Sequence, residues 1–222
     1  IKLNEYKTVF ESGESTIIIE KSKFIGYSRH VETEEDALTF INEIKKKNKD
    51  ATHNVSAYIL GEKMNAQKYS DDGEPSGTAG IPILELMKKE ELTNSAIVVT
   101  RYFGGIKLGA GGLVRAYSKS AKSTLENSLI SQKKIFIPIE ILFDYSFLGK
   151  IQNDISTRNI LASKPDFEDV VKYTIYVDKE EIDSSINHIN DLTSGNVIID
   201  IKDEVLLDFV NDNYILLWFE FI

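Results

Sequence analysis

The first part of the chain combines β-type runs with helical spacing. Residues 15–31 are rich in β-branched and aromatic side chains and predict extended structure, with an interruption at Lys21-Ser22-Lys23. Thr33, followed by three acidic residues, predicts a capped helix start, because acidic side chains stabilise the positive end of the helix dipole. We expect the apolar stripe of this helix to be Leu38, Ile41 and Ile44.

Further apolar runs predict strands at residues 54–60 and 96–100, and a short helix at residues 78–90. A long helix is expected at residues 109–130. Its inward stripe, which steps by four residues, is Leu113, Tyr117, Ala121 and Leu125. At about 100° per residue, the cations of the opposite side are Arg115, Lys119 and Lys122. The stripe is predicted to be core, and the cationic face meets solvent or a partner.

The pattern changes near Pro138, which we take as the boundary between two domains, residues 1–133 and residues 138–222. The elements expected after it are a strand at 139–145, a helix at 148–158, strand material at 170–177, a helix at 180–192 and a strand at 197–201. This βαββαβ order is typical of the ferredoxin-like arrangement. The apolar tail Tyr214–Phe219 needs cover, and we expect it to form an extra strand. The sequence thus predicts an α+β fold in two domains.

Composition limits the classes of protein to consider. The 222 residues are 42% hydrophobic and 27% charged, which is typical of a globular chain. There is no cysteine, which excludes disulfides, thiolate nucleophiles and sulfur-based zinc sites. The first residues lack the apolar core of a signal peptide, and no apolar run approaches the ~20 residues that cross a bilayer. We expect a soluble, cytoplasmic protein that has no contact with membranes.

Charge is distributed unevenly. Residues 1–133 hold 19 Lys and Arg against 18 Asp and Glu, whereas residues 134–222 hold 7 against 17. The net charge of −9 therefore belongs to the C-terminal part, which is a poor surface for nucleic acid. Residues 101–133 carry six cations and only one acidic residue, Glu126, so this stretch is suited to meet an anion.

A first candidate site lies in residues 69–80. Its candidate residues are Asp71, Asp72, Gly73, Glu74, Ser76 and Thr78. Three carboxylates and two hydroxyls could coordinate a hard cation such as Mg²⁺. The alternative, which we favour, is structural: Asp-Gly and Pro-Ser-Gly are turn sequences, and Ser76 or Thr78 would cap the following helix. We accordingly expect no metal and no cofactor.

A second candidate site lies where a strand runs through a glycine-rich loop into the long helix. Its candidate anion-binding residues are Arg101, Gly104, Gly105, Lys107, Gly109, Gly111, Gly112 and Arg115, with Lys119 and Lys122 on the helix beyond. Bare amides at a helix N-terminus with cations nearby favour anion binding. The formal nucleotide motifs fail, because no Gly-Lys-Ser/Thr occurs and Val114 stands where the dinucleotide fingerprint needs glycine. Close backbone packing or positive φ explains such glycines equally well.

The histidines give weaker signals. His30, His53 and His188 are widely spaced, so a metal cluster is not expected. His53 opens a predicted strand, and we favour a capping or core role for it over work as a general base. Lys23, like Lys21, is expected on a solvated edge.

These two segments resemble a known family. Residues 71–80, Asp-Asp-Gly-Glu-Pro-Ser-Gly-Thr-Ala-Gly, and residues 99–109, Val-Thr-Arg-Tyr-Phe-Gly-Gly-Ile-Lys-Leu-Gly, closely resemble the signature of the YigZ/IMPACT family. Ser22-Lys23-Phe24-Ile25 and His53-Asn54 match earlier landmarks of that family. The specific resemblance covers about residues 1–130, and the rest looks like the second domain of the bacterial members. Relatives often have Cys where this chain has Val55, so no cysteine chemistry can be proposed.

The resemblance implies a fold and a setting. The first domain is expected to take the ribosomal-protein-type α/β sandwich also found in elongation factor G, and the second a ferredoxin-like fold. Eukaryotic relatives regulate translation under amino-acid stress through a protein partner, whereas bacterial members have no settled biochemical activity. Nucleic-acid or ribosome association follows only from likeness of fold.

Our hypothesis is a non-enzymatic binding protein, associated with translation, whose N-terminal domain contacts RNA, the ribosome or a translation-related protein. Two alternatives stay open. One is an enzyme that acts on a phosphorylated substrate, with Mg²⁺ held by Asp71, Asp72 and Glu74. The other is a module that only docks a partner protein. The sequence leaves the ligand, the partner and the existence of turnover undecided.

Overall fold

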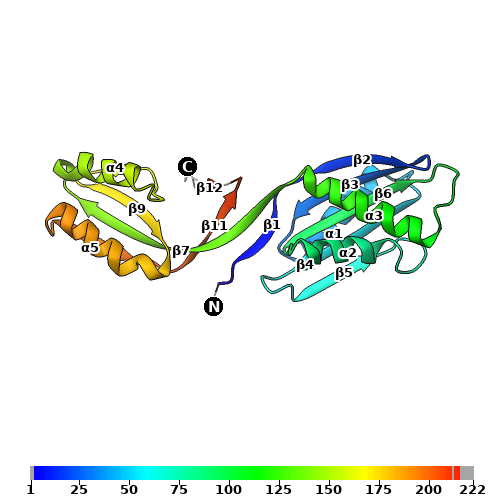
Figure 1. Cartoon of the computed structure of the whole chain (residues 1–222), viewed down its shortest axis with the longest axis horizontal. Coiled ribbons are helices and arrows are strands. Elements are labelled where there is room, and N and C mark those ends of the chain that lie inside the picture. The colour runs from blue at the N-terminus through cyan, green and yellow to red at the C-terminus, as the bar shows by residue number, and fades with distance from the viewer. Residues whose placement is uncertain (1–2, 212, 216–222) are drawn as a thin grey trace. The chain divides into compact units, whose positions relative to one another are not determined.

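The computed structural model describes residues 3–211 and 213–215, and its contacts divide the chain into two units (Figure 1). The N-terminal unit is Tyr6–Lys133. The C-terminal unit contains the described residues from Lys134 onward together with those before Tyr6. Strand β7 (Leu129–Phe143) begins in the first unit and continues into the second. Both units mix helices and strands, so the predicted two-domain α+β fold is confirmed.

The N-terminal unit is built on a five-stranded sheet with the order β2-β3-β6-β4-β5, in which every neighbouring pair is antiparallel. The strands are β2 (Glu14–Ile19), β3 (Ser22–His30), β4 (His53–Leu60), β5 (Ala66–Ser70) and β6 (Ser95–Tyr102). In addition, β1 (Tyr6–Glu11) pairs antiparallel with the start of β7. The extended segments predicted at 15–31, 54–60 and 96–100 are therefore strands.

Helices cover both faces of this sheet (Figure 1). The helices are α1 (Glu34–Lys47), α2 (Gly80–Lys89) and α3 (Gly109–Glu126). Alternate residues of β6 divide between the two layers: Ile97 and Val99 pack in the core with α2 and α3, while Ala96 and Val98 pack with α1. Since side chains alternate along a strand, Arg101 lies on the α2/α3 face with Ile97 and Val99. This register positions the candidate site.

Two helix predictions need correction. Thr33 caps α1 as expected, through a reciprocal capping box with Asp36. Leu38, however, is 46% exposed, and the buried stripe is Ala37, Phe40, Ile41 and Ile44. These four residues follow the i, i+3, i+4, i+7 spacing, which places the large Phe40 ring inside and turns Leu38 outward.

The second correction concerns α3, which ends at Glu126 and not at residue 130. The chain leaves the helix at Asn127 because residues from Leu129 onward pair with β1, with Ile130 opposite Val9. The predicted stripe is otherwise confirmed, since Leu113, Tyr117 and Ala121 are buried and Leu125 is partly buried against them.

The C-terminal unit has the strand order β10-β7-β9-β8, and all of these neighbours are antiparallel. Its elements are β7, a 3₁₀ turn (Tyr145–Phe147), α4 (Leu148–Thr157), β8 (Asp166–Phe167), β9 (Val171–Val177), a 3₁₀ turn (Lys179–Glu181), α5 (Ile182–Thr193) and β10 (Val197–Ile201). The chain order is βαββαβ and the strand order is 4-1-3-2, so the ferredoxin-like prediction is confirmed. The core lies between the sheet and the helices and includes Ile139, Ile151 and Ile189.

The chain continues through Pro138 without interruption, and it adds two strands after β10. Pro138 lies inside β7 opposite Tyr176, with its carbonyl accepting from the Lys202 amide at 2.9 Å, so the chain does not break there. After β10 the chain forms β11 (Val205–Val210) and β12 (Asn213–Ile215), which pair antiparallel. Tyr214 and Ile215, the first two residues of the predicted strand Tyr214–Phe219, belong to β12, and residues 216–219 lie outside the described residues. Within the described chain, no helix is long and apolar enough to span a membrane.

Candidate anion-binding site

Asp71 is the cap of helix α2. Its carboxylate accepts hydrogen bonds from the amides of Gly77 at 2.8 Å, Ala79 at 3.2 Å and Gly80 at 2.8 Å. The expectation that Ser76 or Thr78 caps this helix is therefore wrong, because the loop folds back and brings Asp71 to the helix start. The Thr78 hydroxyl donates instead to the carbonyl of Pro75 at 2.6 Å, which tightens the turn.

Asp72 fastens the same loop to two neighbouring elements. Its backbone is left-handed, with φ of 47°, and the following Gly73 has φ of +89°. One carboxylate oxygen lies 2.7 Å from Lys45 Nζ at the end of α1, and the other accepts from the Asn54 amide at 2.6 Å. The carbonyl of Asp72 lies 2.8 Å from His53 Nδ1. Because a carbonyl only accepts, the Nδ1 of His53 carries a proton, and the Nε2 lies on the side of Glu74.

Glu74 is buried at the centre of a charged network. Its Oε1 accepts from Arg101 Nη1 and from the Tyr117 hydroxyl, both at 2.7 Å, and its side chain is 4% exposed. Its Oε2 lies 3.8 Å from His53 Nε2. Burial raises the pKa of the Tyr117 phenol far above its usual range, and the hydrogen bond to Glu74 raises it further. Tyr117 therefore stays protonated and donates to the carboxylate.

The three carboxylates thus serve three separate sets of partners. Asp71 holds the amides before α2, Asp72 holds Lys45 and a strand amide, and Glu74 holds Arg101 and Tyr117. In the described residues, no group of three or more acidic or histidine side chains is placed to hold a metal ion. The geometry gives the Mg²⁺ alternative no support.

Arg101 lies inside the site rather than on its surface. It stands opposite His53 on β4 and Phe24 on β3, so the sheet register brings these three side chains together. The guanidinium lies over the Phe24 ring at 5.5 Å and over the Phe103 ring at 5.4 Å from each centroid. Its Nη2 donates to Ser22 Oγ at 3.3 Å, whereas its Nε is buried with no acceptor in the described chain. The Glu74 carboxylate neutralises this cation, so Arg101 does not act as the exposed anion contact we expected.

A cavity of about 450 Å³ opens beside this network. Its wall includes the polar side chains of His53, Glu74 and Arg101. The remaining lining residues, mostly apolar or from the glycine-rich loop, are Thr52, Pro75, Phe103, Lys107, Leu108, Gly109, Ala110 and Leu113. The cavity therefore joins the buried ion pair to the first turn of α3, and it brings together both candidate segments of the sequence.

The first turn of α3 is open to an anion. Leu108 stands at the cap position without a capping side chain, and the first turn holds no acidic residue. Gly109, Ala110 and Gly111 are exposed, and among the described residues no side chain caps the start of the helix. Lys107 precedes the turn and is exposed, and Arg115 Nη1 reaches to within 3.7 Å of the position that a Cβ would take on Gly111. Amides, helix dipole and two cations therefore act at one place.

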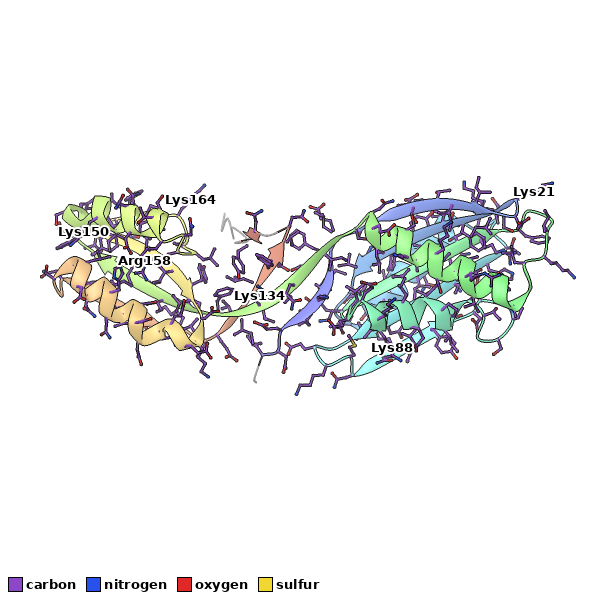
Figure 2. The ribbon with its side chains drawn as sticks, in the orientation of Figure 1. Lys21, Lys88, Lys134, Lys150, Arg158 and Lys164 are labelled. Carbon is purple, nitrogen blue, oxygen red and sulfur yellow. The ribbon has the colours of Figure 1, made fainter. Side chains whose placement is uncertain are left out.

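Most glycines of this loop are required by the fold, but for different reasons. At Gly104 a Cβ would lie 2.0 Å from the carbonyl carbon of Lys21, whose place at the tip of the β2–β3 turn is visible in Figure 2, so close packing requires glycine. Gly105 and Gly109 have positive φ, and Gly112 would place a Cβ 3.0 Å from that of Leu108. Gly111 alone among the loop glycines has neither a positive φ nor a contact closer than 3.7 Å. The fold itself gives no reason for glycine there.

The remaining predicted residues lie away from the cavity. Arg115, Lys119 and Lys122 are exposed along α3, as the helical spacing predicted. Ser76 is exposed in the loop, and Lys23 lies on β3 with its Nζ 5.8 Å from the centre of the Tyr102 ring.

Sequence reasoning missed the polar role of Tyr117, which it placed in the apolar stripe, and the part of Ser22 in holding Arg101. The only signal for Ser22 was its place in a landmark of the resemblance.

Comparisons with known proteins identify the family. The model of the Impact N-terminal domain matches residues 20–125, which include the whole site, and that of a domain of unknown function, DUF1949, matches residues 141–196. IMPACT family member YvyE of Bacillus subtilis is 45% identical over 201 residues, 90% of this chain and 92% of that protein. This chain belongs to the IMPACT family. The resemblance found in the sequence is thereby confirmed.

Two further members and one solved structure extend the comparison. An IMPACT family member of Haemophilus influenzae is 31% identical over 83% of this chain and 91% of its own. The IMPACT homolog of Saccharomyces cerevisiae is 32% identical over 91 residues, 40% of this chain and 35% of its own. A solved structure, titled as that of a hypothetical protein, has a TM-score of 0.58 and 25% identity over 89% of this chain and 97% of its own. The match to the yeast protein shows that a eukaryotic member shares part of this sequence.

Proposed function

We propose that this protein is a non-enzymatic, translation-related regulator that binds RNA through its N-terminal unit. The single observation that carries the proposal is the uncapped first turn of α3, with exposed amides between Lys107 and Arg115. Lys119 and Lys122 extend the same positive charge along the helix. Phosphate groups repeat along an RNA strand, so a row of cations that starts at a helix N-terminus is suited to follow them.

The link to translation rests on family membership and on the regulatory role that the resemblance implies for eukaryotic relatives. Two features support binding over catalysis. Glu74 and Arg101 are paired with each other, and Asp71 and Asp72 are occupied by backbone amides and Lys45. These groups stabilise the loop and the cavity wall, and they leave no carboxylate pair arranged for acid and base work.

Crosslinking in cell lysate, with and without nuclease, tests the proposal. We expect the full chain to retain radiolabelled RNA, to lose it after nuclease treatment, and to retain much less when Lys107 and Arg115 are both replaced by Gln. The matched control replaces Lys63 and Lys89 by Gln, two exposed cations of the same unit outside the cavity lining. Crosslinks that are insensitive to nuclease and to the Lys107/Arg115 change would instead support a module that only docks a partner protein.

A further inference from the structure

The cavity beside α3 combines an apolar wall with groups that form hydrogen bonds. Pro75, Phe103, Leu108 and Leu113 provide apolar surface, and His53, Glu74 and Arg101 provide polar atoms. Its volume of about 450 Å³ lies within the range of small-molecule sites. A ligand with a flat apolar body and a polar edge would match both kinds of surface.

Phe103 presents an aromatic ring to this space. Its side chain is 47% exposed although it is large and apolar, and the Arg101 guanidinium lies over the ring at 5.4 Å from its centroid. A half-exposed ring in the wall of the cavity offers a surface on which a flat ligand can stack. Proteins that bind single strands place unstacked bases on such rings, because every base has a π face.

The polar atoms of the cavity also point to a ligand. Arg101 is 6% exposed in its side chain, yet its Nε has no acceptor in the described chain. The Nδ1 of His53 donates to the Asp72 carbonyl, which leaves the Nε2 of the ring on the side of Glu74. The Oε2 of Glu74 lies 3.8 Å from that nitrogen, which is beyond direct hydrogen-bond distance. The edge of a heterocycle, which carries donors and acceptors side by side, would satisfy these groups.

We propose that the cavity receives one unpaired nucleotide of a single-stranded RNA. The base stacks on Phe103 with its edge toward His53, Glu74 and Arg101. The adjoining phosphate lies on the first turn of α3, where Lys107 and Arg115 flank the open amides. This inference rests on the proposed function, and it adds that the protein selects single strands, because a base held in a duplex cannot enter a cavity.

Fluorescence anisotropy with the full chain tests the inference. The probes are an end-labelled, unstructured single-stranded RNA and an RNA hairpin of the same composition with a short tetraloop. We expect Phe103→Ala to weaken binding of the single strand by roughly 5- to 150-fold, the range that corresponds to one lost base stack, and to leave binding of the hairpin stem unchanged. The matched control is Phe167→Ala, which removes a phenylalanine that is 55% exposed in the other unit. Circular dichroism of both variants checks that the fold is intact.

The other outcomes separate the two proposals. If Phe103→Ala leaves single-strand binding unchanged while the Lys107/Arg115 change weakens binding of both RNAs, the inference falls and the proposed function stands. If the wild-type chain binds neither RNA, both fall. A free nucleoside monophosphate that displaces the single strand at the strand's own concentration would assign the cavity to free nucleotides and overturn the RNA ligand.

Discussion

Replacing Gly111 by alanine is expected to stabilise the N-terminal unit and to weaken its binding to RNA. Gly111 lies in the first turn of α3 with ordinary helical φ, and a Cβ there would meet only Arg115 Nη1, at 3.7 Å. Alanine therefore fits without strain. It lowers the conformational entropy of the unfolded chain and raises the free energy of unfolding by about 0.4–1 kcal/mol. For a chain of this size, that corresponds to a rise in Tm of roughly 1–4 °C.

The affinity of Gly111→Ala for RNA should fall, although its stability rises. A methyl group on Gly111 stands over the amides that we assign to phosphate, so one charge-assisted hydrogen bond is lengthened or lost. Such a bond contributes about 1.5–3 kcal/mol, which corresponds to a loss of affinity of roughly 10- to 150-fold. Thermal denaturation followed by circular dichroism gives the stability, and fluorescence anisotropy with a labelled RNA gives the affinity.

The control is Gly149→Ala in the first turn of α4, where the added Cβ has nothing within 4 Å. This variant should gain similar stability and keep the wild-type affinity. The reasoning is refuted if Gly111→Ala binds RNA as tightly as the wild type, because the open amides then have no role in binding. It is also refuted if the variant is destabilised, because glycine would then be required by the fold.

Three further predictions concern the network behind the cavity. Glu74→Gln leaves the Arg101 guanidinium buried without its counter-charge, so urea denaturation should show that the free energy of unfolding falls by about 3–5 kcal/mol. The control Glu85→Gln, in an exposed pair with Lys88, should change it by less than about 1 kcal/mol, and equal effects would contradict a buried pair. Because burial raises the pKa of Tyr117, its phenol should stay protonated while the unfolded chain ionises above pH ~10, so stability should fall as pH rises above that value. In an absorbance titration, Tyr117→Phe should therefore lose one tyrosine from the step that accompanies unfolding and none from the earlier step, and an unchanged late step would contradict the assignment. Because the three loop carboxylates are occupied, calorimetry should show no Mg²⁺ binding tighter than millimolar, for the wild type and for Asp72→Asn alike, and a micromolar isotherm that this change abolishes would revive the enzyme alternative.

Local patterns were sufficient for much of the fold. The Thr33 cap, the order of elements in the C-terminal unit and the cationic face of α3 depend on residues close together in sequence, and each agrees with the structure. Leu38 was misplaced because its spacing with Ile41 and Ile44 is also helical. The larger Phe40 ring decides which side of α1 is buried, and a stripe of three aliphatic residues does not reveal that.

The site depends on contacts that spacing does not contain. Arg101 meets Glu74 because β6 lies between β3 and β4, and this order of strands sets it opposite His53 and Phe24. Asp71 caps α2 because the loop closes over nine positions to Gly80. Sequence alone could identify the two candidate segments. It could not show which amide or cation each of the three carboxylates would contact. Tyr117 likewise fits an apolar stripe by position, and only the packed structure shows its hydroxyl on Glu74.

The salt dependence of RNA binding tests the central claim, that phosphates lie along α3, most directly. Filter binding of a single-stranded RNA to the full chain is measured at several salt concentrations, for the wild type and for the Arg115/Lys119/Lys122→Gln variant. Each phosphate contact contributes about 0.7–0.9 to the slope of log K against log salt, so the account predicts a slope that is shallower by about two to three in the variant. The Lys63/Lys89→Gln control should keep the wild-type slope. Equal slopes for the wild type and the α3 variant, or no retention of RNA by either, would contradict the claim.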